Sequence, residues 1–136
     1  DLGSWKEICK MYGRNKRQYF KKNNVFHRPW GSYINLFKGK KFLIKELHVN
    51  PKGILSLQKH HHRSEHWLVT HGKPKITLNK KCFIMKPNEH IFIPSKSIHR
   101  IQNSEKRPVK IIEAQLGSVL KESDIVRYQD IYGRIK

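Results

Sequence analysis

Short apolar runs separated by turn residues are the feature that most limits how this chain can fold. Breaks such as Asn50-Pro51-Lys52-Gly53 and Gly72-Lys73-Pro74 are built from residues that favour turns. No long helical pattern lies between these breaks, and many closely spaced strands favour an antiparallel sandwich or barrel. The sequence therefore predicts an all-β domain. Its expected strands are residues 33–37, 42–49, 55–60, 65–70, 75–78, 82–86, 90–93, 99–103 and 109–116.

The first 27 residues have a different texture. Ser4 and Glu7 form a capping-box pattern at the start of a short amphipathic helix, and Gly13 ends it. The basic stretch that follows, to Asn24, is typical of a solvated linker. We expect residues 1–27 to be a helix plus a linker and residues 28–136 to form the folded domain. Residues 121–131 fit either a short helix or a strand. The N-terminal helix would present one apolar face made of Trp5, Ile8, Cys9 and Tyr12.

The chain carries a formal net charge of +19, from 29 Lys and Arg against 10 Asp and Glu. Its hydrophobic content of 37% argues against a disordered chain. The basic residues are spread along the whole sequence and most are lysines, so we do not expect nucleic acid to be the ligand. A positive field would still steer a phosphorylated substrate. No apolar run is long enough to span a membrane. Two distant cysteines, Cys9 and Cys82, favour a reducing cytoplasm over a disulfide framework.

The segment from Gln58 to His66 concentrates metal-binding side chains, with three consecutive histidines at 60–62 followed by Glu65. Neutral imidazole and carboxylate oxygen suit Zn, Mn, Co, Ni or Fe. A strand over residues 55–60 would place Gln58 and His60 on one face, and a hairpin would bring Glu65 opposite them. A further ligand would come from a distant strand, and His99 follows a turn. The alternatives are that His99 is a hydrogen-bonded structural residue and that the histidine run is a tag.

Two motifs in this region resemble those of cupins, small barrels that hold a metal at their centre. Glu65 and Gly72 fit HxH(x)3–4E(x)6G, and Pro94, His99 and Asn103 fit PxG(x)2H(x)3N. The strings RPWGSY from residue 28, LSLQ from 55, HHHR from 60 and EHW from 65 resemble type II mannose-6-phosphate isomerases. IEAQ from 112, DIVR from 124 and YGR from 132 extend the resemblance to residue 134. The resemblance implies a cupin double-stranded β-helix, or jelly-roll barrel, here with a short N-terminal helix.

In many proteins such a domain is the C-terminal half of a bifunctional enzyme that also has mannose-1-phosphate guanylyltransferase activity. Residues 1–5, DLGSW, resemble the motif near the end of that guanylyltransferase domain. The sequence contains no Gly-rich nucleotide loop, so we do not expect it to transfer nucleotides. The resemblance suggests an isolated domain of a longer protein or a remnant of a fusion.

The resemblance also implies a ligand set for one divalent metal. Counting back from Glu65 along the first motif places the metal-binding histidine at His60 and the preceding ligand at Gln58, with His99 from the second motif. His62 shares strand parity with His60 and is the spare candidate. We expect zinc, with cobalt, manganese or nickel as alternatives.

The implied reaction interconverts mannose 6-phosphate and fructose 6-phosphate, in the supply of GDP-mannose for polysaccharides. A base must move a proton between C1 and C2, and His62 and Glu113 are equal candidates by strand position. The phosphate calls for cationic partners. Trp30 and Trp67 could form a wall of the pocket, although core packing suits Trp67 better. We expect a homodimer. The candidate phosphate ligands are Arg127 and Arg63, followed by Lys59 and Arg100.

Three positions depart from the family pattern, in which glycine is usual: Lys52, Asn88 and Lys96. Asn tolerates a left-handed backbone better than Lys does, so these changes bear on loop geometry more than on the ligands. The main alternative function is therefore a non-catalytic cupin that binds a phosphosugar or a sugar nucleotide. A sugar-nucleotide epimerase would need a His–Asp or Tyr proton relay, which the sequence does not show.

Overall fold

The computed structural model describes residues 25–135, and the helix predicted near residues 4–12 lies outside them. Among these residues all regular structure is strand, which confirms the all-β prediction, and no helix capable of crossing a membrane occurs. The strands are β1 (Val25–Arg28), β2 (Gly31–Gly39), β3 (Phe42–Val49), β4 (Leu57–Lys59), β5 (Arg63–His71), β6 (Lys75–Leu78), β7 (Lys81–Ile84), β8 (His90–Ile93), β9 (His99–Gln102), β10 (Val109–Gly117) and β11 (Val126–Gln129).

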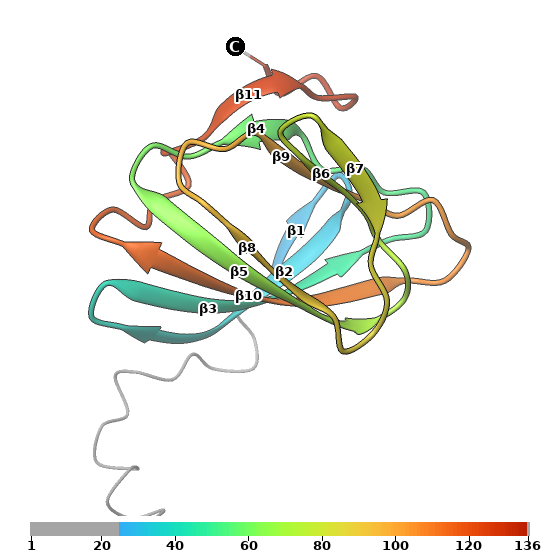
Figure 1. Ribbon diagram of the computed structural model, residues 1–136, viewed down its shortest axis with the longest axis horizontal. Helices are drawn as coiled ribbons and strands as arrows, with labels where there is room; N and C mark the ends of the chain where they lie inside the picture. Colours follow the sequence, from blue (N-terminus) through green and yellow to red (C-terminus); the bar gives the residue numbers. More distant parts are fainter. Residues whose placement is uncertain (1–24, 136) are drawn as a thin grey trace, which may run out of the picture.

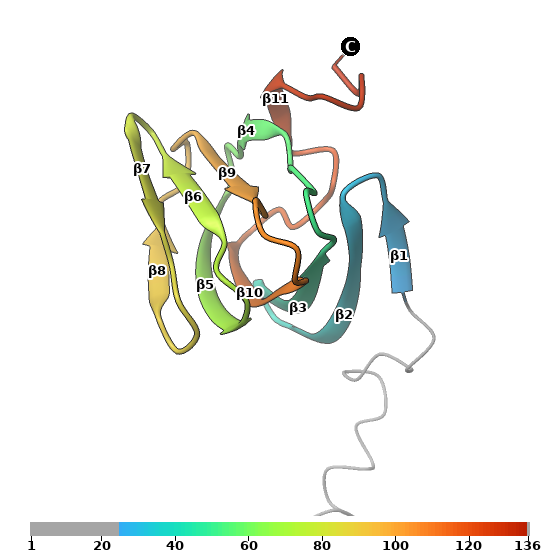
Figure 2. The same cartoon turned by 90° about the vertical axis from the view of Figure 1, so that its right-hand side faces the viewer.

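The strands form two antiparallel sheets that face each other (Figure 1). The six-stranded sheet has the order β1-β2-β3-β10-β5-β8, and the five-stranded sheet has the order β11-β4-β9-β6-β7. Figure 2 shows β1 and β2 at one side of the barrel and β7 and β8 at the other. Because neighbours in each sheet come from distant parts of the sequence, the barrel brings residues 58, 65, 99 and 113 around one interior.

Buried and less buried residues alternate along the central strands. The buried ones are apolar at one end of the interior and polar at the other. In β3 and β10 every second residue is buried, as expected for strands with one face on a core. Val49 lies opposite Val109, and both are fully buried. Further along the same two strands the inward pair is Lys45 opposite Glu113. The apolar end stabilises the barrel, and the polar end leaves charged groups inside it.

The predicted strands were close to the observed ones. β3, β6 and β8 have the predicted bounds, and the others agree within a few residues, except for two short edge strands. β1 pairs with β2 and begins within residues 1–27, the stretch assigned to the N-terminal helix and linker. Residues 121–131, which fitted either a helix or a strand, contain the strand β11. Both edge strands are four residues long and largely exposed, so they lack the alternation that marks a half-buried strand.

The hairpin expected between Gln58 and Glu65 was wrong. β4 belongs to the five-stranded sheet and β5 to the six-stranded one, so residues 60–62 cross from one sheet to the other. Strand parity does not apply to a crossing, which removes the reason for grouping His62 with His60. The two ends of the crossing still face the same interior because the sheets face each other.

Within residues 25–135, five non-glycine residues have positive φ, and three of them are the positions where the resemblance described above implies glycine. The φ angles are 65° at Lys52, 73° at Asn88 and 66° at Lys96. These turns therefore adopt the left-handed geometry although each carries a side chain. For a lysine this conformation costs about 1–2 kcal/mol relative to its preferred backbone.

The substitution Lys96→Gly should raise the free energy of unfolding by about 1 kcal/mol, because glycine adopts this φ without a steric cost. Chemical denaturation measures the change. Lys106→Gly is the matched control, an exposed lysine outside the positive-φ set, and it should destabilise the domain by about 0.5–1 kcal/mol. Equal effects of the two substitutions would contradict the idea that Lys96 is strained.

Candidate metal centre

Four side chains with metal-binding atoms meet at the polar end of the barrel. Gln58 on β4 lies opposite His99 on β9 in the strand register. Gln58 Nε2 lies 3.5 Å from His60 Nε2, and the rings of His60 and His99 are 4.9 Å apart. Glu65 Oε1 lies 3.0 Å from His60 Nε2. Candidate ligand atoms of His60, Glu65 and His99 all lie within 4.8 Å of one another.

Hydrogen bonds on the far side of both imidazole rings determine which nitrogen faces the centre. His60 Nδ1 lies 2.6 Å from the carbonyl oxygen of Asp124, and His99 Nδ1 lies 3.0 Å from that of Ser97. A carbonyl oxygen can only accept, so each Nδ1 carries the hydrogen and each Nε2 presents a lone pair. This is the arrangement usual for metal-binding histidines. Burial lowers the pKa of His99, which favours the neutral ring.

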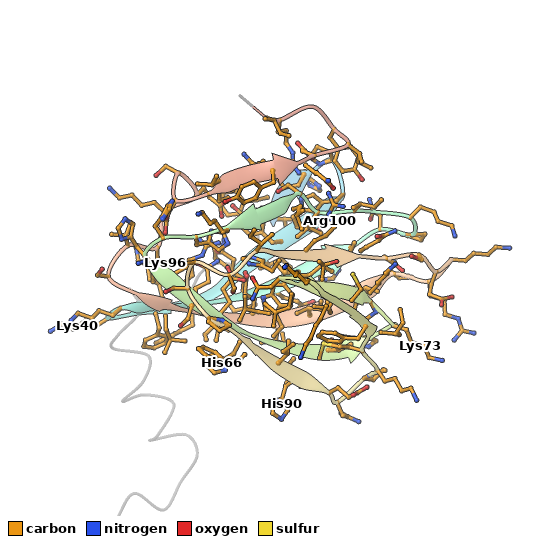
Figure 3. The ribbon with its side chains drawn as sticks, turned by 45° about the horizontal axis from the view of Figure 1, so that its top comes forward. Lys40, His66, Lys73, His90, Lys96 and Arg100 are labelled. Carbon is orange, nitrogen blue, oxygen red and sulfur yellow. The ribbon has the colours of Figure 1, made fainter. Side chains whose placement is uncertain are left out.

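Successive residues of β5 point to opposite faces of the sheet, so Glu65 points into the barrel and His66 points outward. Figure 3 shows His66 and His90 projecting away from the barrel, whereas Glu65 is only 1% exposed. Its carboxylate accepts hydrogen bonds from Arg63 Nε at 3.0 Å and Trp67 Nε1 at 2.8 Å. Burial alone would raise the pKa of Glu65, but a hydrogen bond with Glu113 and the nearby Arg63 guanidinium hold it well below its usual range. Glu65 is therefore a buried carboxylate anion.

These residues fit a divalent cation. His60 Nε2 and Glu65 Oε1 are both acceptors yet lie 3.0 Å apart, and His99 Nε2 is buried without a partner among the described residues. Ligand bonds of about 2.0–2.2 Å to one ion place such atoms about 3–4 Å apart. A cavity of about 20 Å³ touches Gln58, Glu65 and His99, enough for one ion or water.

Arg63 is the group that competes with a cation for this position. Its Nη2 lies 3.1 Å from His60 Nε2, to which it donates, and the residue is only 5% exposed. Arg63 Nη1 is buried with no partner in the described part of the chain. A cation on His60 Nε2 would displace this hydrogen bond and leave both Nη nitrogens of the guanidinium without this partner or any other in the described part of the chain.

A second cavity of about 60 Å³ adjoins the centre and is rich in arginine. Arg127 reaches it from β11, where it lies opposite Gln58, and its Nε is buried without a partner among residues 25–135. Trp30, predicted as a wall residue, also lines this cavity. Unpaired guanidinium groups in a small cavity can bind an anion. The cationic residues around it are Arg28, Lys45, Arg63, Arg127 and Arg134.

Glu113 lies between the two cavities and lines both. It is 6% exposed and accepts a hydrogen bond from Gln115 Nε2 at 3.2 Å. Burial and the neighbouring Glu65 carboxylate raise the pKa of Glu113 well above its usual value. In this arrangement Glu113 therefore holds a proton and shares it with Glu65.

Two predicted residues, His62 and Lys59, line neither cavity, and the guanidinium of a third, Arg100, is already bonded elsewhere. His62 is exposed, and its backbone N–H donates to Asp124 Oδ2. Lys59 follows Gln58 on β4 and points to the other face, with its ammonium 5.9 Å from the Tyr128 ring. Arg100, next to His99, lines the smaller cavity, but it donates through Nε to the Leu55 carbonyl at 2.9 Å. Strand alternation next to the inward Gln58 explains the position of Lys59.

Sequence reasoning missed Lys45, Glu122 and the role of Asp124. Lys45 is 5% exposed, bonds Glu122 Oε1 at 2.7 Å and lies 4.1 Å from the centre of the Tyr33 ring. A signal for Lys45 was available, since it interrupts the apolar inward face of the strand at residues 42–49. Neither Glu122 nor Asp124 had such a signal, because both lie on an irregular segment.

Comparison with known proteins gives a consistent assignment. A family model described as mannose-6-phosphate isomerase, C-terminal, matches residues 14–130. The chain is 47% identical over 108 residues to alginate biosynthesis protein AlgA of Pseudomonas fluorescens, covering 79% of this chain and 22% of that protein. It is 38% identical over 129 residues to mannose-1-phosphate guanylyltransferase ManC of Salmonella typhimurium, covering 95% of this chain and 26% of that protein. The chain thus spans about a quarter of the length of these relatives.

The fold has a solved counterpart in the cupin domain of Cnp3 from Schizosaccharomyces pombe. The two superpose with a TM-score of 0.63 at 19% sequence identity, covering 71% of this chain and 69% of that chain. At this identity the likeness concerns the fold alone, and it identifies the two-sheet barrel as a cupin. The family match covers all of the described strands, so the chain belongs to the family of mannose-6-phosphate isomerase C-terminal domains.

Proposed function

We propose that this domain is a metal-dependent isomerase that interconverts mannose 6-phosphate and fructose 6-phosphate. The observation that carries the proposal is the position of a buried His–Glu–His group beside an arginine-lined cavity. The small cavity at that group shares Gln58 and Glu113 with the arginine-lined one. The first supplies metal ligands and the second supplies partners for a phosphate. Membership of the family adds the substrate class.

Gln58, His60, Glu65 and His99 would hold the ion, which we expect to be zinc. When bound, a divalent cation stabilises the negative charge that develops on the sugar's carbonyl oxygen during enolisation. Zinc itself, assembly as a homodimer and a cytoplasmic location are predictions from the sequence.

Glu113 is the better of the two predicted bases. It lies in both cavities, whereas the His62 ring is at the surface. In the proposed reaction Glu113 acts after losing the proton that it holds in this arrangement. Its carboxylate then takes the proton from C2 of the aldose and returns it to C1 of the cis-enediol. Gln115 donates a hydrogen bond to its carboxyl group and so orients it.

The arginines would bind the phosphate and so place C1 and C2 near Glu113. Arg127 has an unpaired buried Nε, and Arg63 has an unpaired buried Nη1. Arg28 and Arg134 extend the same lining. Charge-assisted bonds from guanidinium groups are among the stronger polar contacts, and they add geometric selectivity for phosphate.

The second candidate is a module that binds a phosphosugar or sugar nucleotide without turnover. Two observations favour it. Arg63 Nη2 donates a hydrogen bond to the lone pair of His60 Nε2, and a bound ion would need that same lone pair. The arginine-lined cavity of about 60 Å³ is also smaller than the roughly 300–1,000 Å³ typical of ligand sites. Side chains must rearrange before a hexose phosphate can enter.

The decisive experiment is a coupled assay for fructose 6-phosphate formed from mannose 6-phosphate. Activity should disappear with a chelator and return with one added divalent ion. His99→Ala should abolish both bound metal and turnover while the barrel stays folded by circular dichroism. Turnover in metal-free protein would refute the mechanism, and metal binding without turnover would favour the binding module.

Glu113→Gln should lower kcat by about 10²- to 10⁴-fold, the usual contribution of a positioned acid–base group. His62→Ala should leave kcat within about twofold, because the ring is exposed and outside both cavities. Steady-state kinetics at saturating substrate measures both variants. A large loss in His62→Ala with a small one in Glu113→Gln would reverse the assignment.

Arg127→Ala should raise KM for the phosphosugar by about 10- to 100-fold, since charged hydrogen bonds contribute about 1.5–3 kcal/mol. Its bound metal should not change. Lys59→Ala is the matched control, because it removes a positive charge from the paired strand on the face away from the cavity. An unchanged KM in Arg127→Ala would remove this residue from the phosphate site.

A further inference from the structure

One residue of the C-terminal segment, Asp124, contacts both the ring of a candidate ligand and the backbone of the crossing beside it. Its carbonyl oxygen accepts from His60 Nδ1 at 2.6 Å. Its carboxylate accepts the backbone N–H of His61 through Oδ1 at 3.0 Å and that of His62 through Oδ2 at 2.9 Å. Asp124 is 9% exposed. Three hydrogen bonds therefore join this residue to three consecutive positions of the crossing.

The carboxylate controls where the carbonyl lies. Both oxygens of the side chain are held by adjacent N–H groups, so the residue cannot slide along the crossing without breaking a bond. The carbonyl of the same residue is thereby placed against the ring of His60. On the other side, the backbone of His60 is held through its own carbonyl, which accepts from Lys96 N–H at 2.8 Å. Backbone and ring are thus positioned by two separate segments.

This double contact decides the tautomer and the direction of the His60 ring. Because the Asp124 carbonyl can only accept, Nδ1 keeps its hydrogen and Nε2 faces Glu65 and Gln58 with a lone pair. The crossing has no strand partner of its own to do this, since it lies between two sheets. Within residues 25–135, Asp124 is the residue that accepts the backbone N–H groups of His61 and His62.

We infer that Asp124 is a positioning residue that clamps the crossing and presents His60 Nε2 to the metal. The inference rests on the proposed metal site, and it assigns to the C-terminal segment a part in building that site. Groups that orient a metal-binding histidine typically contribute 10- to 100-fold to metal affinity. We expect a loss of that size when the carboxylate is removed.

The test compares Asp124→Ala with Asp130→Ala in the whole chain. Asp130 is a matched control on the same segment, since its carboxylate also accepts two backbone N–H groups, from Tyr132 and Arg134. No contact joins Asp130 to the candidate ligands in the described structure. Zinc affinity is measured by competition with a chromophoric chelator. The ring ¹⁵N shifts of His60 are measured in metal-free protein, assigned with His60→Gln.

Asp124→Ala should weaken zinc binding by about 10- to 100-fold and replace the single Nδ1–H tautomer of His60 with a mixture. Asp130→Ala should change neither, even if both variants melt at a lower temperature. Asp124→Asn keeps one side-chain oxygen acceptor, so it should fall between Asp124→Ala and the unsubstituted protein. This milder variant also carries the test if Asp124→Ala fails to fold.

The outcomes separate this inference from the proposed function. If the zinc affinity and the tautomer of His60 are unchanged in Asp124→Ala, the inference is overturned and the isomerase proposal stays intact. Equal losses in Asp124→Ala and Asp130→Ala would also overturn it, because the effect would be general destabilisation. If the unsubstituted protein binds no zinc, the metal proposal fails. The tautomer measurement would then still support or overturn the clamp.

Discussion

The structure depends on a carboxylate held inside a barrel. Glu65 is almost fully buried, and an isolated charge in such a place costs several kcal/mol unless other groups compensate it. Arg63 and Trp67 donate to its two oxygens, and Glu113 shares a proton with it. The polar end of the interior is arranged around that compensation. The apolar end, centred on residues such as Val49 and Val109, supplies the stability that permits it.

Compensation by protein groups alone leaves three acceptor atoms incompletely balanced, although Arg63 donates to two of them, His60 Nε2 and Glu65 Oε1. His60 Nε2 and Glu65 Oε1 face each other as acceptors, and His99 Nε2 has no partner within residues 25–135. A divalent cation would satisfy all three atoms at once. The same feature links stability to function, because the charge that is costly to bury is the one that would attract the ion.

Most of the fold could be predicted from the sequence. A half-buried strand shows hydrophobic residues at every second position, and a turn is marked by Gly, Pro and Asn. The strands at residues 42–49, 75–78 and 90–93 were predicted with the observed bounds. β1 and β11 were not, because short exposed edge strands carry little alternation. The left-handed turns at Lys52 and Lys96 were suspected from the glycines that the resemblance implies there, and the observed φ values are positive at both positions.

The site was predictable in its residue types and less so in its geometry. The sequence alone determined that Gln58, three histidines and Glu65 lie close together, and that inward positions of the strand at residues 109–116 include Glu113. The motif resemblance pointed to His60 among the three, but only the tertiary structure decided how its ring is held toward the centre. Residues 60–62 cross between sheets, where neither the strand period nor the helix period orients a side chain. There the direction of a ring is set by hydrogen bonds from distant segments, in this case from Asp124 and Lys96.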